Sequence, residues 1–200
     1  MRSGKTLAMT IEAYRESRKG RTVYSNYGLS FPHLDMDDQM VGEATKHNRT
    51  TEFDGSVTAI DEIHVYMDSR NSSSKKNRLL SYFVTQSGKL DTLLLWTSQY
   101  LSQVDKRLRL NTQILYKAER YIIRKGKKIL LRQDDKREDF YIDLHKHVFG
   151  EKKGRLGFFY EKTITLRTPK KYFGLYDTKQ RIRYTGELRD ERDDKQKGLR

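Results

Sequence analysis

Cysteine is absent from the 200 residues of this sequence. Disulfide bonds and thiolate metal sites are therefore excluded, and the composition fits a protein of a reducing compartment. No apolar run approaches the roughly 20 residues that a membrane-spanning helix needs, and the polar start does not resemble a signal peptide. We therefore expect a cytoplasmic protein without a membrane span. A chain of this length can bury one main core, so we expect one principal domain with a small appendage.

Acidic side chains are too few to balance the basic ones, and the formal net charge is +14. The excess is concentrated in residues 111 to 185, which carry 20 basic and 9 acidic side chains. Such a local excess favours a polyanionic partner such as nucleic acid. The alternative is an ordinary solvated basic surface.

The first six residues, MRSGKT, match the second half of the phosphate-binding loop GxxxxGK[ST]. In that loop the backbone N–H groups surround phosphates, the Lys ammonium reaches the β and γ phosphates, and the hydroxyl holds Mg²⁺. These roles predict a nucleotide site formed by Arg2, Ser3, Gly4, Lys5 and Thr6, with Thr6 as a Mg²⁺ ligand. Residues 7 to 18 then read as a helix with Gly20 as its C-cap, and the helix N-terminus would add its dipole to the site.

The first glycine of the loop and the buried strand that precedes it are missing from this pattern. A bare GK[ST] is common by chance, and an ordinary helix start is the alternative interpretation. A missing central strand would expose sheet edges at a cost exceeding the ~5 to 15 kcal/mol stability of a typical domain. We therefore expect further residues before Met1 in the natural protein; otherwise the nucleotide site is compromised.

A second motif lies at residues 56 to 62, SVTAIDE, where a β-prone apolar run ends in two carboxylates. This is typical of a Walker B strand, because Mg²⁺ and the hydrolytic water bind at the carboxyl end of a buried parallel strand. Asp61 would hold Mg²⁺ through water, and Glu62 would polarise the attacking water. A helix N-cap followed by a first-turn Glu is the alternative.

A third apolar run, residues 91 to 99, also ends in polar residues. Gln99 at its tip is a candidate sensor of the γ phosphate. Shortly afterwards Arg107 and Arg109 are candidates for an arginine that reaches the active site of a neighbouring subunit. Either arginine could equally be a surface ion-pair partner. Between the two runs, serines at 72 to 74 are candidate N-caps for a helix ending near Ser87.

From Thr112 onward the pattern becomes alternating and predicts β hairpins with turns at Lys125-Gly126 and Lys153-Gly154. The expected strands are Gln113–Ile123, Lys128–Arg132, Phe140–Val148 and Arg155–Leu166. The domain prediction is a P-loop core over residues 1–120, a basic hairpin region with an aromatic docking segment over 121–185, and a charged, disordered tail over 186–200. Basic and aromatic side chains on such strands can bind a nucleic-acid backbone.

Taken in order, RSGKT, AIDEIH, WTSQ and VDKRLR resemble the FtsK/HerA superfamily of P-loop ATPases, most closely its Zot-like and viral DNA-packaging members. The resemblance covers about residues 1 to 120. It implies a RecA/ASCE-like α/β fold, a parallel sheet flanked by helices, here followed by the basic hairpins. The chain departs from the family in lacking the first strand, and no membrane segment is visible although filamentous-phage Zot proteins usually carry one.

The resemblance implies ATP and Mg²⁺ as cofactors, with Lys5, Thr6, Asp61, Glu62 and Gln99 in the site and Arg107 or Arg109 as the finger. It also implies a homo-oligomeric ring, usually a hexamer, that moves double-stranded DNA in the host cytoplasm or at a viral procapsid. Two other functions stay open. One is a Zot-like phage assembly or secretion ATPase, and the other is a non-catalytic nucleic-acid-binding module with a vestigial nucleotide site.

Overall fold

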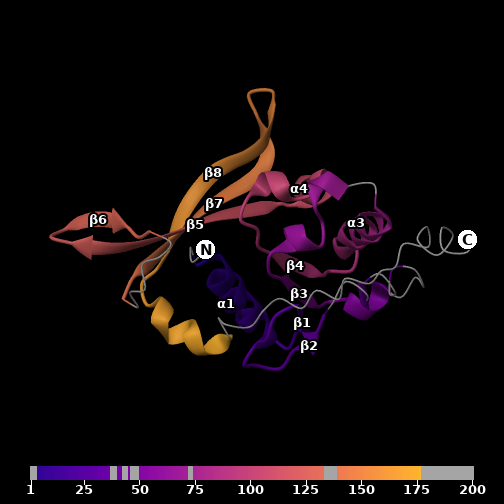
Figure 1. Cartoon of the computed structure of the whole chain (residues 1–200), viewed down its shortest axis with the longest axis horizontal. Helices are drawn as coiled ribbons and strands as arrows, with labels where there is room; N and C mark the ends of the chain where they lie inside the picture. The colour runs from indigo at the N-terminus through magenta and orange to yellow at the C-terminus, as the bar shows by residue number, and fades with distance from the viewer. Residues whose placement is uncertain are drawn as a thin grey trace, which may run out of the picture.

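The computed structural model describes residues 4–36, 40–41, 45, 50–71, 74–132 and 139–176. Figure 1 shows two sheets with helix α1 lying between them. The helices are α1 (Lys5–Ser17), α3 (Lys75–Ser87) and α4 (Lys106–Asn111). The strands are β1 (Val23–Ser25), β2 (Leu34–Asp35), β3 (Val57–Ile60), β4 (Leu93–Trp96), β5 (Ile114–Arg124), β6 (Lys127–Leu130), β7 (Tyr141–Lys152) and β8 (Arg155–Leu166).

The first sheet is parallel and has the strand order β2-β1-β3-β4. Each neighbouring pair is parallel, with Val57 opposite Leu93 in the pairing of β3 with β4. All four residues of β3 are buried, which explains why its sequence is a continuous apolar and β-branched run. The predicted α/β architecture, a parallel sheet flanked by helices, is confirmed.

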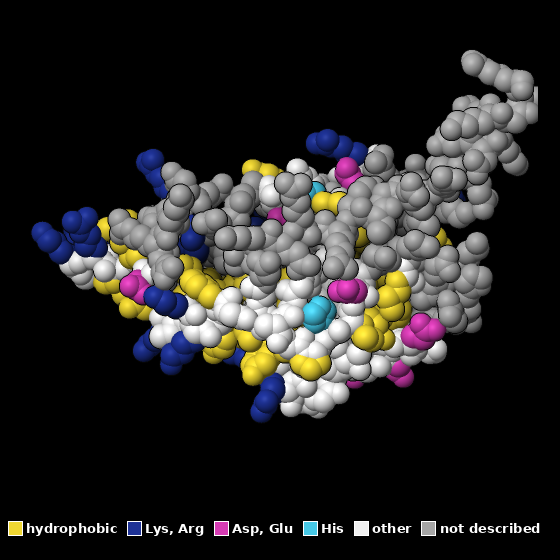
Figure 2. Space-filling view, turned by 60° about the horizontal axis from the view of Figure 1, so that its bottom comes forward, with side chains coloured by type: hydrophobic (Ala, Val, Ile, Leu, Met, Phe, Trp, Pro, Cys, Tyr) yellow, Lys and Arg dark blue, Asp and Glu magenta, His cyan; other side chains and the backbone are white. Residues whose placement is uncertain are grey.

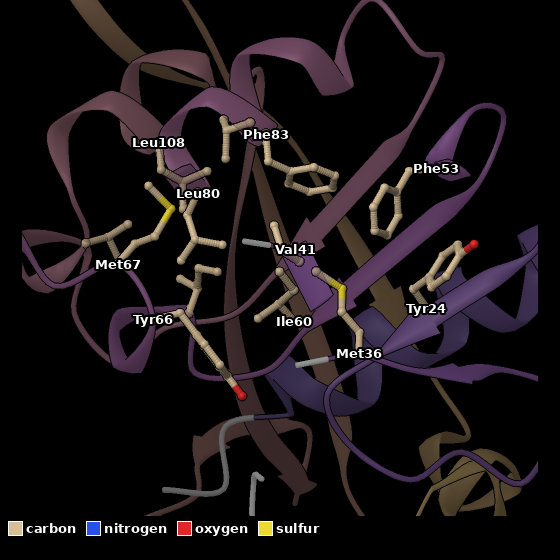
Figure 3. Close-up of a cluster of buried hydrophobic side chains, with 13 residues drawn as sticks. Tyr24, Met36, Val41, Phe53, Ile60, Tyr66, Met67, Leu80, Phe83 and Leu108 are labelled. Carbon is tan, nitrogen blue, oxygen red and sulfur yellow. The ribbon is translucent and has the colours of Figure 1, made fainter. Parts of the chain in front are cut away.

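The two faces of the parallel sheet are covered by different helices, because successive strand residues point to opposite faces. Val57 and Ala59 pack with Met9 and Ala13 of α1. On the other face, Ile60 belongs to a cluster that includes side chains of α3 and α4. Figure 3 shows this cluster, which contains Tyr24, Met36, Val41, Phe53, Ile60, Tyr66, Met67, Leu80, Phe83 and Leu108.

The predicted helices exist, with differences at their ends. Helix α3 begins after Ser74, whose hydroxyl accepts a hydrogen bond from the amide of Asn77, as the serine pattern predicts. Helix α1 begins at Lys5 rather than residue 7, because Gly4 adopts the left-handed conformation that starts it. Its C-cap is Arg18 rather than Gly20, which has a φ of 91° in the turn that follows.

The second sheet is antiparallel and has the order β6-β5-β7-β8. A third hydrophobic cluster joins this sheet to α1, with Leu7 and Ile11 of the helix against Phe140 and Ile142. The 3-10 segment Pro169–Leu175 also contributes side chains to this cluster. Helix α1 is thus buried between the two sheets (Figure 1).

Some predictions lie outside the described residues. These are Arg2, Ser3, most of a short helix expected near residues 37 to 46, and the whole of the predicted tail 186–200. Among the helices that the structure does describe, none is long and apolar enough to span a membrane.

Candidate nucleotide-binding site

The candidate site lies where β3 ends and α1 begins. Asp61 directly follows β3, and Thr6 is the second residue of α1. The Thr6 hydroxyl donates a hydrogen bond to Oδ1 of Asp61 over 3.0 Å, although the two residues are 55 positions apart in sequence. The fold therefore brings the GKT sequence and the residues after the apolar run into direct contact.

The start of α1 has the backbone features of a phosphate site. Gly4 is the N-cap, with a φ of 90° and a ψ of 9°. The first amides of a helix have no intrahelical acceptor, so they can donate to an anion, and the helix dipole favours negative charge there. Lys5, the first residue of α1, is half-buried at this same end. These features provide donors and positive charge on the side where Asp61 provides an acceptor.

Thr97 connects the two carboxylate residues that follow β3. Its hydroxyl donates a hydrogen bond to Oδ1 of Asp61 and accepts one from the backbone amide of Glu62 over 3.0 Å. The backbone pairing of β3 with β4 continues through it, because the Thr97 amide donates to the carbonyl of Ile60 over 3.0 Å. Thr97 is not among the site residues expected from the sequence. Its position as the first polar residue after β4 is the signal that could have identified it.

Asn26 holds the same peptide from the opposite side. Its Oδ1 accepts from the Asp61 amide over 2.7 Å, and its Nδ2 donates to the Asp61 carbonyl over 3.0 Å. Nδ2 also lies 3.3 Å from the hydroxyl of Tyr66. Asn26 is 5% exposed, so these bonds are shielded from water. It follows β1 directly and is not among the site residues expected from the sequence.

Glu62 has a strained backbone and an incompletely paired carboxylate. Its φ of 51° and ψ of 52° are in the left-handed region, which non-glycine residues rarely adopt. Its buried Oε2 accepts no hydrogen bond from the described residues, although Nδ1 of His64 lies 3.3 Å away. The same His64 nitrogen lies 3.4 Å from the hydroxyl of Ser98. A strained residue with an unsatisfied carboxylate oxygen is a feature of functional sites.

The oxygens at this site suit a small, hard cation. Asp61 contributes a carboxylate, and the hydroxyls of Thr6 and Thr97 converge on its Oδ1. Mg²⁺ is commonly bound by one or two protein oxygens together with water and substrate phosphates rather than by a cluster of carboxylates. The described residues contain no group of three or more His, Cys, Asp or Glu placed to hold a metal.

The nearby charge of Asp61 contributes to raised pKa values of two tyrosines, the buried Tyr27 and the half-buried Tyr176. Burial raises the pKa of Tyr27 above its ordinary range, and the negative charge of Asp61 adds to the shift. Burial also raises the pKa of Tyr176 to about 12, again with a contribution from Asp61. The phenols of Tyr27 and Tyr176 therefore stay neutral at physiological pH.

The other predicted site residues lie farther along the chain. Gln99 is exposed and follows the end of β4 by three residues. Arg107, on α4, forms hydrogen bonds with Asp105 of the same chain, from Nε over 3.0 Å and from Nη2 over 2.9 Å. Arg109 is half-buried, and its Nε donates to no acceptor among the described residues. Thr97 is the residue after β4 that contacts Asp61, and the role of Gln99 as a γ-phosphate sensor stays a prediction.

Comparison with solved structures finds a similar fold in the N-terminal domain of zonular occludens toxin from Neisseria meningitidis. The two chains share 17% identity with a TM-score of 0.54, and the match covers 88% of this chain and 94% of the other. The sequence matches no protein-family model, and no curated protein is similar enough to count as a relative. At this identity the likeness concerns the fold, an α/β domain of the kind seen in the N-terminal domain of that toxin.

Proposed function

We propose that the protein is a P-loop ATPase that uses ATP hydrolysis to move double-stranded DNA for a virus or mobile element. The observation that carries the ATPase part is the 3.0 Å hydrogen bond from Thr6 to Asp61. It joins the hydroxyl of a GKT sequence at a helix N-terminus to the first carboxylate after a buried parallel strand. The fold similarity to the toxin domain supports the same interpretation at the level of the fold.

Each group in the site has a role that follows from its chemistry. The ammonium of Lys5 and the first amides of α1 bind phosphate oxygens. Thr6 and Asp61 are the protein oxygens that would hold Mg²⁺, directly or through water, and the bound ion would supply neutralisation of phosphate charge. Glu62 orients the attacking water, and Asn26 and Thr97 fix the peptide that carries it.

The proposed assembly is a homo-oligomeric ring, a hexamer, in which an arginine from one subunit completes the site of the next. Arg107 and Arg109 are the candidates. Arg107 is held by the buried Asp105, whose side chain is 1% exposed. An arginine already paired in its own chain must break that pair to reach a neighbour, which favours Arg109.

Two other functions remain as alternatives. The fold similarity to the N-terminal domain of a zonular occludens toxin supports a Zot-like phage assembly or secretion ATPase. The basic excess of residues 111 to 185 supports a nucleic-acid-binding module whose nucleotide site is vestigial.

The proposal is tested by the Glu62→Gln variant, assayed for ATP hydrolysis with and without duplex DNA and for binding of a fluorescent ATP analogue. We expect nucleotide binding to persist and turnover to be lost. Glu12→Gln is the matched control, because Glu12 is an exposed carboxylate on α1 that pairs with Arg15. Equal turnover in Glu62→Gln and the wild-type protein would remove Glu62 from the mechanism.

Lys5→Ala separates the motor from the binding module. DNA-stimulated hydrolysis that disappears in Lys5→Ala supports the motor. DNA binding that ignores ATP and survives in Lys5→Ala, without measurable hydrolysis by the wild-type protein, supports the module instead.

A further inference from the structure

The two hairpins of the antiparallel sheet end in the same unusual turn. In one, Lys125 has a φ of 50° and Gly126 a φ of 75°; in the other, Lys153 has a φ of 52° and Gly154 a φ of 71°. Positive φ at both central positions is the pattern of a type I′ turn, whose first position favours Asn, Asp or Gly. Lysine adopts this conformation only at a cost in conformational energy. The presence of lysine in both turns, despite this cost, indicates that its positive charge has a role other than forming the turn.

The positive charges at these tips differ from those on the faces of the sheet. On the faces, Lys128 binds Asp143 over 2.7 Å and Lys146 binds Glu161 over 2.8 Å. The side chains at the tips are exposed, and none forms an ion pair with another described residue; they are Arg124, Lys125, Lys127, Lys152, Lys153 and Arg155. Figure 2 shows Lys and Arg side chains gathered at the end of the molecule that the β5–β6 hairpin forms.

The two tips lie at opposite ends of the sheet. Tyr121 pairs with Tyr141, so the β5–β6 turn lies beyond the start of β7, whereas the β7–β8 turn follows the end of β7 at Lys152. About 14 residues of strand separate them, which at ~3.4 Å per residue gives at most roughly 48 Å along the sheet. Figure 1 shows the two turns far apart, on hairpins that point in different directions, so a compact anion such as a nucleotide would contact only one of them. The ligand they fit is an extended polyanion.

We propose that the two Lys-Gly turns are contacts for the backbone phosphates of double-stranded DNA, an inference that rests on the DNA partner of the proposed function. A duplex carries phosphates along its whole length and spans this separation with about one and a half helical turns. Insertion into a membrane surface needs large apolar side chains at the outermost positions. Here the outermost residues are lysine and glycine, and the exposed Ile123 and Leu156 lie behind them.

The test uses substitutions that remove the charge and suit the turn better. In Lys125→Asn and Lys153→Asn the new side chain favours the left-handed conformation, so the hairpins should fold at least as well as in the wild-type protein. Lys89→Asn is the matched control, because Lys89 is an exposed turn lysine between α3 and β4. The affinity for a labelled 30-base-pair duplex is measured as a function of salt concentration, together with hydrolysis of ATP in the absence of DNA.

Loss of one phosphate contact makes the negative slope of log K against log [salt] less steep by about 0.9. If the affinity at 1 M salt is unchanged, this is about an eightfold loss of affinity at 0.1 M salt. We expect this change in each tip variant, an additive change in the double variant, no change in Lys89→Asn and unchanged DNA-free hydrolysis in all. Duplex binding by the wild-type protein with an unaltered slope in both tip variants would overturn the tip proposal and leave the motor standing.

A second outcome points to a different polyanion. If the wild-type protein does not bind the duplex, but binds vesicles of phosphatidylserine and phosphatidylcholine through the same two lysines, then the tips contact membranes. That result would overturn the DNA proposal, and ATP hydrolysis by the same preparation would show whether the ATPase part survives.

Discussion

Gly4 lies directly against Ile142, so that a Cβ atom added to Gly4 would come within 2.6 Å of Cδ1 of Ile142. Gly4 begins the helix at the candidate phosphate site, and Ile142 is a fully buried residue of β7. The antiparallel sheet therefore packs directly against the backbone at the start of α1, where the candidate phosphate site lies. Any larger residue at position 4 must shift the Ile142 side chain or the start of α1.

Gly4→Ala is expected to weaken nucleotide binding and to lower the free energy of unfolding by about 1 to 3 kcal/mol, because both the left-handed φ and the close contact oppose a Cβ. Gly20→Ala separates the two causes, since Gly20 has a φ of 91° but no atom within 4 Å of the point that a Cβ would occupy. Ile142→Val removes the contacting Cδ1, so it should rescue part of the loss.

Equal effects of Gly4→Ala and Gly20→Ala on stability would exclude the contact as a cause. Chemical denaturation and titration with a fluorescent ATP analogue measure these quantities.

Thr97→Val is expected to lower kcat by about tenfold or more with a small change in KM, because the hydroxyl that joins Asp61 to the Glu62 amide is lost while the site keeps its phosphate donors. Thr97→Ser should restore most of the activity. Thr92→Val is the matched control, since the Thr92 hydroxyl bonds the carbonyl of Phe53 at the other end of β4. Comparable kcat in Thr97→Val and Thr92→Val would show that Thr97 is structural only.

Asn26→Ala removes the side chain that bonds both backbone groups of Asp61. We expect a decrease of about 2 to 3 kcal/mol in the free energy of unfolding, because buried donors and acceptors are left unpaired, and a decrease in kcat because Glu62 is less well placed. Asn111→Ala, which removes an exposed amide bonded to the Arg107 carbonyl, should change either quantity little. Wild-type kcat in Asn26→Ala would contradict the positioning role. Urea unfolding and steady-state kinetics are the measurements.

Asp105 makes stability depend on pH at the start of α4. Burial alone would raise the pKa of Asp105, but hydrogen bonds from Arg107 hold it below the ordinary value of 3.8. Its charged form therefore stabilises the folded state at pH values above 3.8, and this contribution is lost as the pH falls through the lowered pKa. Asp105→Asn should cost about 1 to 2 kcal/mol at pH 7 and progressively less below about pH 4.

Unfolding of wild-type protein and Asp105→Asn by urea at pH 7 and at pH 3 measures this difference. Asp54→Asn, at an exposed carboxylate, should have a small effect at both pH values. A destabilisation by Asp105→Asn that stays constant with pH would argue that the amide packs poorly and that the ion pair with Arg107 contributes little.

The sequence predicts the parallel sheet well, because β3 and β4 are apolar runs that end abruptly in polar residues. It predicts Asp61 and Glu62 for the same reason. It does not predict Asn26 and Thr97, because their roles depend on which strands flank β3. The order of strands in a sheet cannot be inferred from the hydrophobic pattern of a single strand. Gln99, the predicted γ-phosphate sensor, is exposed and lies three residues beyond the end of β4, whereas Thr97 makes the hydrogen bonds to Asp61 and to the Glu62 amide.

The surroundings of α1 are also only partly predictable. Its sequence suggests one apolar face with Leu7, Ile11 and Tyr14. Leu7 and Ile11 do pack together against the antiparallel sheet, whereas Tyr14 contacts Phe31. Met9 and Ala13 form a second buried face against the parallel sheet. Periodicity alone cannot assign two apolar faces of a short helix to two different sheets, because that assignment depends on contacts between segments far apart in sequence.

The burial of α1 between both sheets has a consequence for how the molecule melts. Neither sheet can lose its packing without exposing one face of the same helix, so the two halves of the fold share one cooperative unit. A calorimetric scan should then contain a single endotherm, and any ligand that binds the N-terminus of α1 should shift that endotherm as a whole.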